Sequence, residues 1–330
     1  MVVMRVPRRV GRGVSGISRL AELLRSGQFV VTAELASSDS ADPDAVGRNG
    51  DQLRGVADAI NCTDNTGAHV HLSSMAAAHL LAERGIEPIM QLTVRDRNRL
   101  ALQADLLGAA ALGIRNIVVM SGDDVTAGDH PEARRIYDID SMQLIEVAAG
   151  MRDRGVYLSG RKLEKAPAFF IGAVENPFAP PLEFRPLRLQ KKVRAGADFV
   201  QTQLVFDLPI FTRFMSMAAD LGLFEQVFII PSIGIPRSAR GARFMKEKVP
   251  GLHVPDALIE RMEKTPPARQ AEEGIRIAVE LVNDVRQIHG VAGVHLIGIK
   301  WEEGVTRVAE AAGLLPRPTL SPLATVGGRR

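Results

Sequence analysis

Cysteine is almost absent from this 330-residue chain, in which Cys62 is the only one. A single cysteine cannot form an intramolecular disulfide, and no cluster of cysteines and histidines has the spacing of a zinc site. These two facts exclude a disulfide-stapled secreted domain and an ordinary zinc-binding module. The simplest setting for the protein is therefore a reducing cytoplasm.

Aromatic residues are also scarce, at 5% of the chain, and they do not alternate with basic residues. This composition argues against a surface on which nucleic-acid bases stack. The basic excess is small, because 41 lysines and arginines face 38 aspartates and glutamates and give a net charge of +3. Such a balance is weak evidence for a polyanionic partner, so we expect no nucleic acid.

Long apolar runs are missing as well. No stretch approaches the roughly 18 uninterrupted apolar residues of a membrane-spanning helix, so we expect no membrane. The opening MVVMRVPRRVGRG is basic but leads into no apolar segment, unlike a secretory signal. The segment GDDVTAGD lacks a phosphate-loop lysine, and no G-x-G-x-x-G follows the first apolar run. Phosphate-loop and Rossmann cofactor sites are therefore unsupported.

What the chain does contain is a series of short apolar runs, typical of strands buried on both faces. Segments with helical spacing lie between them, and many end near a glycine. Eight strands alternating with about eight helices is the count of a (β/α)8 TIM barrel, an α/β fold, with a doubly wound sheet as the second possibility. The runs cover residues 29–35, 57–63, 87–93, 115–121, 168–174, 198–206, 226–232 and 293–299.

We expect one barrel domain over residues 28–310. Residues 1–27 would form an N-terminal extension with a first helix. Residues 311–330 are rich in Pro, Gly and Ser and would form a flexible C-terminal tail.

A barrel strand points its last residues at the active-site mouth, so polar residues at strand ends are candidate site residues. The sequence has such residues at nearly every predicted strand end, namely Glu34, Thr63, Asp64, Gln91, Thr93, Ser121, Asp123, Glu175, Asn176, Gln201, Gln203, Ser232, His295 and Lys300.

Glu34 is the most informative candidate because it lies within the apolar run VVTAELAS. Burying a carboxylate is costly unless a partner or a function requires it. Partial burial would raise its pKa and allow general acid catalysis near neutral pH. The alternative is a structural glutamate that is ion-paired with a neighbouring strand.

The other candidates also have structural alternatives. Asp123 follows a glycine, and its alternative is an aspartate in an ordinary polar turn. Gln201 and Gln203 share one face of a buried strand and could bind a heterocycle, or could form a structural layer of the barrel. Lys191 and Lys192 on the fifth helix fit a solvated face better than a ligand site.

Several segments together resemble the methylenetetrahydrofolate reductase family. The strongest is KKVRAGADFVQTQLVFDLPIFTRF at 191–214, which is similar to the family's Lys-x-x-x-Gly-Ala-x-x-x-x-Thr-Gln-x-x-Phe-Asp signature. Supporting segments are TAEL, NCTD, QLTVRDRN, GIRNIVVMSGDD and IIPSIGIP, in the same order as the family's strands. The likeness extends from about residue 28 to residue 310.

The resemblance implies a barrel that binds FAD, takes a hydride from NADH or NADPH and reduces methylenetetrahydrofolate to methyltetrahydrofolate. On matching positions, Glu34 would be the acid that opens the bridging ring of the folate. Asp123 would lie beside the flavin and the pterin, and Gln203, with Gln201, would bind the folate. Thr63 and Lys192 would contact the flavin.

Three further positions assigned to the cofactor site depart from the family's usual residues. Gln91 and Asn176 stand where the family has histidines, and Ser121 stands where it has an arginine. These departures affect flavin contacts more than folate contacts. The resemblance therefore also allows a divergent paralogue for a related pterin, or a folate-binding barrel without flavin that serves as a partner subunit. A homo-oligomer is a further expectation.

Overall fold

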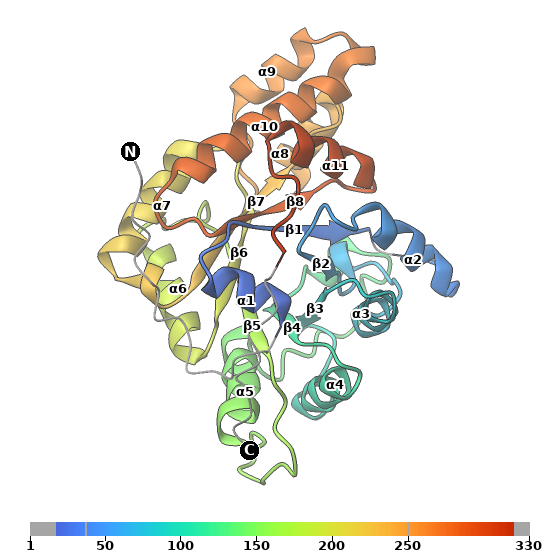
Figure 1. The fold of residues 1–330 in the computed structure, drawn as a ribbon, viewed down its shortest axis with the longest axis vertical. Helices are drawn as coiled ribbons and strands as arrows, with labels where there is room; N and C mark the ends of the chain where they lie inside the picture. Colours follow the sequence, from blue (N-terminus) through green and yellow to red (C-terminus); the bar gives the residue numbers. More distant parts are fainter. Residues whose placement is uncertain (1–17, 37, 250, 320–330) are drawn as a thin grey trace, which may run out of the picture.

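The computed structural model describes residues 18–36, 38–249 and 251–319. Its eight strands are all parallel to their neighbours and close into a barrel in sequence order, with helices around it (Figure 1). The predicted TIM barrel is confirmed. The strands are Val30–Leu35 (β1), Ala59–Cys62 (β2), Pro88–Thr93 (β3), Asn116–Met120 (β4), Phe170–Glu175 (β5), Phe199–Leu204 (β6), Phe228–Gly234 (β7) and Gly293–Ile297 (β8).

The helices include the eight expected between strands and three more, α1, α9 and α11. None of the described helices is long and apolar enough to cross a membrane. The helices are Arg19–Arg25 (α1), Pro43–Gln52 (α2), Ser74–Glu83 (α3), Arg99–Ala111 (α4), Ser141–Arg154 (α5), Phe184–Ala195 (α6), Leu208–Asp220 (α7), Ala239–Lys248 (α8), Asp256–Lys264 (α9), Gln270–Gln287 (α10) and Glu302–Ala311 (α11).

Four one-turn 3-10 helices complete the elements. They are Thr66–Ala68 (η1), Val125–Ala127 (η2), Leu223–Glu225 (η3) and Pro267–Arg269 (η4).

Closure of the barrel joins the first strand to the last. Thr32 pairs with Ala59 of β2 on one side and with His295 of β8 on the other. Because successive side chains of a strand point to opposite faces, alternate residues of each strand fill the barrel or contact the helices. The result is two buried layers, one inside the barrel and one between strands and helices.

The amino-terminal end of the barrel is filled by apolar side chains and closed by α1. This cluster includes Val30, Ala59, Ile89, Val118, Phe170, Phe199, Phe228 and Ile230, together with Leu20, Leu23 and Leu24 of α1. The carboxylate of Glu87 accepts hydrogen bonds from the backbone N–H groups of Arg19 and Leu20, which holds the start of α1 in place. Because this end is filled, we expect a ligand site at the opposite end, where the strands terminate.

The two ends of the described chain meet at this base. The buried carboxylate of Asp58 is paired with both Arg19 and Arg317, and the guanidinium of Arg19 also donates to the carbonyl of Pro318 at 2.8 Å. Residues 1–17 of the predicted extension and residues 320–330 of the predicted tail lie outside the described residues.

Candidate functional site

Glu34 is the penultimate residue of β1, and its carboxyl group is enclosed by protein although part of the residue is exposed. Burial raises the pKa of Glu34 from 4.5 to about 7; the hydrogen bond from Gln91 opposes this rise, and the charge of Asp123 adds to it. The amide Nε2 of Gln91 donates to Oε2 of Glu34 at 3.5 Å. A carboxyl group that titrates near neutral pH can hold or accept a proton under physiological conditions.

The charge of Asp123 adds to the raised pKa of Glu34, so the two carboxyl groups lie within electrostatic range of each other. Its Oδ2 accepts a hydrogen bond from the backbone N–H of Gly67 at 2.8 Å. The preceding Gly122 has a φ of +85°, and a Cβ there would lie 3.2 Å from Thr93. A glycine is therefore required at this turn, and the turn directs Asp123 to the same mouth as Glu34 and Gln91.

Arg95 forms hydrogen bonds to the loops around this mouth. It was not identified from the sequence. Its guanidinium is buried and forms two 2.7 Å hydrogen bonds with the carboxylate of Asp96. It also donates to the backbone carbonyls of Asn65, at 3.3 Å, and Asp123, at 2.9 Å. The pKa of Arg95 is raised, chiefly by the hydrogen bonds to Asp96. Loops after β2, β3 and β4 are thus joined by one cation.

Below the mouth, a layer of uncharged polar side chains crosses the barrel interior. The amides of Asn61 and Gln201 form two hydrogen bonds with each other, at 2.7 and 3.1 Å. Gln201 also donates to Oγ1 of Thr32 at 3.2 Å, and that hydroxyl lies 2.9 Å from Nδ1 of His295. Burial lowers the pKa of His295 to about 3, so its imidazole is neutral. We call these four residues the polar floor.

Three predicted site residues lie close in sequence to residues of the polar floor. Glu34, Thr63 and Gln203 each follow a floor residue by two positions, after Thr32, Asn61 and Gln201 respectively. Gln201 itself is buried, and both ends of its amide are used within the floor.

Gln203 lies at an irregularity in β6, where the pairing with β7 shifts between Gln201 and Leu204. Its Oε1 accepts a hydrogen bond from the backbone N–H of Leu204 at 2.9 Å. This bond fixes the orientation of the amide. Gln203 is therefore set to offer the N–H groups of Nε2, rather than its oxygen, to a ligand.

Lys192 and Asn176 form polar contacts at the end of β5 and in the segment that follows it. The ammonium of Lys192 donates to the carbonyl of Val174 and lies 2.6 Å from Oε2 of the buried Glu175. Nδ2 of Asn176 donates to the carbonyl of Gly251 at 2.7 Å. Both predicted cofactor contacts thus already have protein partners.

The remaining two predicted contacts differ in exposure. Thr63 is buried directly after β2, whereas Ser121 is exposed directly after β4. The hydroxyl of Ser121 lies 3.5 Å from that of Ser141, the first residue of α5. Across residues 18–36, 38–249 and 251–319, no group of three His, Cys, Asp or Glu side chains could hold a metal ion.

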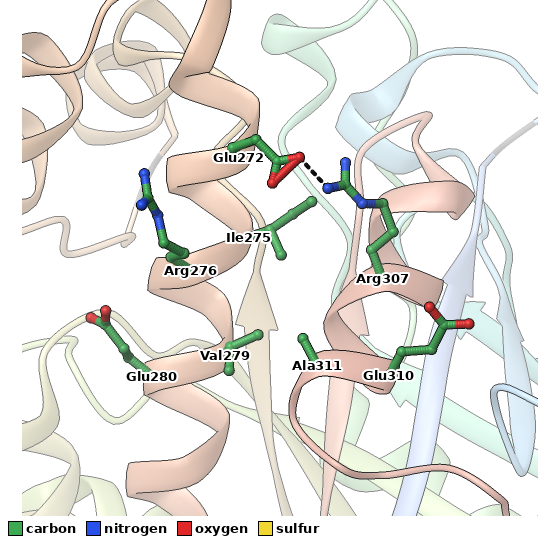
Figure 2. A pocket seen from close by; sticks show the side chains of 8 residues that line it. All are labelled: Glu272, Ile275, Arg276, Val279, Glu280, Arg307, Glu310 and Ala311. Atoms are coloured by element: carbon green, nitrogen blue, oxygen red, sulfur yellow. Dashed lines mark hydrogen bonds and ion pairs between the residues drawn. The ribbon is translucent and has the colours of Figure 1, made fainter.

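A surface groove of about 650 Å³ lies elsewhere, between α10 and α11 (Figure 2). Ion pairing between Glu272 and Arg307 bridges its two helices. Its lining contains none of the predicted site residues, so we do not assign it to the site. The lining residues are Glu272, Ile275, Arg276, Val279, Glu280, Arg307, Glu310 and Ala311.

Comparison with known proteins places these features in context. The family model for methylenetetrahydrofolate reductase matches residues 19–313. Methylenetetrahydrofolate reductase 2 of Schizosaccharomyces pombe is 25% identical over 268 residues, covering 76% of this chain and 40% of that protein. A probable methylenetetrahydrofolate reductase (NADPH) of Caenorhabditis elegans is 24% identical over 248 residues, covering 73% and 34%. The chain thus spans less than half the length of these relatives.

One solved structure with the same fold is an uncharacterized protein from Clostridium thermocellum that binds two copies of 5-methyl-5,6,7,8-tetrahydrofolic acid. It has a TM-score of 0.63 and 13% sequence identity, and the match covers 90% of this chain and 99% of that chain.

Proposed function

The chain belongs to the methylenetetrahydrofolate reductase family, and we propose that it is an oxidoreductase that reduces 5,10-methylenetetrahydrofolate to 5-methyltetrahydrofolate. The observation that carries the proposal is Glu34, an enclosed carboxyl group with a pKa of about 7 beside Asp123. Reduction requires a proton donor that opens the bridging ring of the folate. A carboxyl group with this pKa suits that task at neutral pH.

In this mechanism Glu34 gives its proton to the ring nitrogen, and the ring opens to leave an iminium carbon. Gln91 orients the Glu34 carboxyl group through its hydrogen bond. Asp123 favours the protonated form of Glu34 by its negative charge. Gln203 donates from Nε2 to the pterin. Gln201 acts from the polar floor and supports Gln203 rather than contacting the substrate.

FAD, when bound, would accept a hydride from NADH or NADPH and deliver it to the iminium carbon. The residues present fit such an anionic cofactor at α6, where Lys192 and Arg185 approach the end of β5. Nε of Arg185 is buried and has no hydrogen-bond partner. We propose that Thr63, Lys192 and the turn at Ser121 line the flavin site, with Gln91 and Asn176 at its border.

The second candidate is a folate-binding barrel without flavin that acts as a partner subunit, or as a homo-oligomer, in transfer of one-carbon groups. Two observations favour it. Gln91, Ser121 and Asn176 replace residues that the family uses toward flavin. In addition, the Clostridium thermocellum protein with this fold binds two copies of 5-methyltetrahydrofolic acid.

An absorbance spectrum of the purified full-length chain, with and without added FAD, separates the two candidates. Calorimetric titration with 5-methyltetrahydrofolate is the companion measurement. Flavin absorbance together with folate binding supports the reductase, and folate binding without flavin supports the partner subunit. A chain that binds neither compound would refute both.

A further inference from the structure

Asp123 is held at two points by the loops around it. Its Oδ2 accepts a hydrogen bond from the backbone N–H of Gly67 at 2.8 Å, and its backbone carbonyl accepts one from Nη1 of Arg95 at 2.9 Å. The same guanidinium donates from Nη2 to the backbone carbonyl of Asn65, two residues before Gly67, at 3.3 Å. Arg95 therefore contacts both Asp123 itself and the short loop that binds its carboxylate.

The loop that binds this carboxylate has an unusual backbone. Asn65, Gly67 and Ala68 have φ values of +49°, +66° and +60°, in the left-handed region that residues other than glycine seldom adopt. Such a conformation persists only where its surroundings impose it. The hydrogen bond from Arg95 to the carbonyl of Asn65 is one such constraint, so the direction of the Gly67 N–H group depends on Arg95.

Arg95 is itself fixed in place. Its side chain is 2% exposed, and its Nε and Nη2 donate to the two oxygens of the Asp96 carboxylate, each at 2.7 Å. Hydrogen bonding to Arg95 is the main cause that lowers the pKa of Asp96, so Asp96 supplies a lasting counter-charge. A planar guanidinium can bind one carboxylate in this forked manner and still donate to carbonyl groups, whereas an ammonium group lacks that geometry.

The negative charge of Asp123 is left free to act on Glu34. Arg95 binds the backbone carbonyl of Asp123, and within the described residues it forms no ion pair with the carboxylate. Further charged or titratable side chains at the ends of the neighbouring strands and in the segments that follow them are Asp64 with Arg97, Arg95 with Asp96, His71 with Asp39, His295, Lys300 and Glu302. Of the charged groups at this mouth, Asp123 is the one whose charge raises the pKa of Glu34 beyond the effect of burial.

We propose that Arg95 is a positioning residue, which holds the carboxylate of Asp123 toward Glu34 and so fixes the electrostatic partner of the acid. Its part in folate reduction rests on the proposed function. Its effect on Glu34 needs no ligand and can be measured in the chain alone.

Positioning and simple charge predict opposite results when Arg95 is replaced. Loss of a positive charge near the mouth would by itself raise the pKa of Glu34, because a cation favours the carboxylate form. Release of Asp123 would instead lower that pKa, because the negative charge that opposes ionisation moves away. A fall in the pKa of Glu34 therefore reports lost positioning.

The experiment is an NMR pH titration of the full-length chain with ¹³C-labelled glutamate carboxyl groups, in which the Glu34 signal is identified by its absence from Glu34→Gln. Asp123→Asn should lower the pKa of Glu34 from its value of about 7. Arg95→Met should lower it by the same amount. The double variant Arg95→Met/Asp123→Asn should lower it no further than Asp123→Asn alone, because both changes act through one carboxylate.

Two further variants complete the test. Arg95→Lys keeps the positive charge but lacks the fork, so it should also lower the pKa of Glu34, and it answers the question if Arg95→Met does not fold. Arg99→Met is the matched control, because Arg99 also joins the segment after β3 to the loop after β4, through Asp138, without a contact to Asp123. Arg99→Met should leave the pKa of Glu34 unchanged, and circular dichroism checks the fold of each variant.

Three results would overturn the proposal. One is a pKa of Glu34 that stays unchanged or rises in Arg95→Lys. The others are an equal fall in Arg99→Met and additive falls in the double variant, since either would show an effect that does not pass through Asp123.

Activity separates this proposal from the reductase. In a chain that reduces methylenetetrahydrofolate, Arg95→Lys should slow the folate half-reaction about tenfold to a hundredfold and move its pH dependence to lower pH, since the acid and its partner are misplaced. A chain without this activity in which Arg95→Lys still lowers the pKa of Glu34 would remove the proposed function and keep the positioning role. A fully active chain in which that pKa does not respond would keep the reductase and refute the role of Arg95.

Discussion

Burial is the main cause of the raised pKa of Glu34, and the character of its neighbours adds to it. The floor beneath it consists of amides, a hydroxyl and a neutral imidazole, and the nearby Asp123 is negative. Arg95 is close to the mouth, but its guanidinium is engaged with Asp96 and two backbone carbonyls. An unneutralised carboxyl group in such surroundings keeps its proton to higher pH.

Glu34→Gln should retain the fold and flavin binding, because glutamine has nearly the same size. Folate reduction should fall by about 10²–10⁴-fold, since an amide cannot deliver the proton that opens the ring. Oxidation of reduced nicotinamide by the flavin needs no such proton and should continue. Stopped-flow measurement of the two half-reactions checks this, and equal loss of both would show that Glu34 is structural.

The same variant should change how stability depends on pH. The folded-state pKa of Glu34, about 7, exceeds its ordinary value of 4.5, so the folded state binds more protons between these pH values. Its contribution to stability therefore falls as pH rises from 4.5 through 7. Between pH 4.5 and 7, urea unfolding should show the stability of Glu34→Gln increasing relative to that of the unaltered chain. Above pH 7 the difference between the two chains should stay constant. A constant difference from pH 4 to 8 would contradict the raised pKa.

His295 should act in the opposite direction. Its folded-state pKa of about 3 lies below its ordinary value of 6.5, so the unfolded state binds the extra proton. Stability is lost as pH falls below about 6.5, by up to about 1.4 kcal/mol per pH unit from this residue. His295→Gln should remove that slope in urea unfolding between pH 6.5 and 4.

At the scale of elements, the polar floor joins strands on opposite sides of the barrel. Asn61→Leu or Gln201→Met alone should cost about 1–3 kcal/mol of unfolding free energy, because each leaves the buried amide of the partner residue without its hydrogen bonds. The double variant should cost less than the sum, since both amides are then gone. Chemical denaturation of all four chains measures this coupling. Asn61→Leu combined with Ile229→Val, on the helix-facing side of β7, should instead be additive.

The sequence predicted the strands closely but not their ends. The run 57–63 contains the strand Ala59–Cys62, and 226–232 overlaps Phe228–Gly234, because apolar periodicity reports burial whereas hydrogen bonding to neighbours sets the boundaries. The helix Asp256–Lys264 was missed; it lies between α8 and α10 in the long connection from β7 to β8, where only those two helices were predicted.

The site was predicted less completely. Glu34 and Asp123 were predicted as site residues because the ends of barrel strands gather at one mouth, and this assignment stays a prediction. Arg95 was missed because, within the charged segment RDRN, it looks like a solvated residue. The pairing of Asn61 with Gln201 joins residues 140 positions apart, and no local pattern indicates such a partner.

At the scale of the whole molecule, the ion pairs at Asp58 that join the two ends of the described chain should stabilise the fold. Arg317→Met removes one of two cations from the buried Asp58, and breaking a buried ion pair costs about 3 kcal/mol or more. Thermal unfolding should show a clear drop in the midpoint temperature. Arg307→Met, which breaks an exposed pair with Glu272, should cost about 1 kcal/mol or less. Equal drops in midpoint temperature for the two variants would show that the ion pair of Arg317 with Asp58 stabilises the fold no more than an exposed pair does.

That junction also constrains how the protein can fold as it is synthesised. The hydrogen bond from Arg19 to Pro318 spans 299 residues, and β1 closes the barrel only by pairing with β8. A nascent chain can therefore close the barrel only after β8 has emerged from the ribosome. Until then β1 and β7 are open edges that can pair with another chain, a hazard that ends when β8 inserts between them.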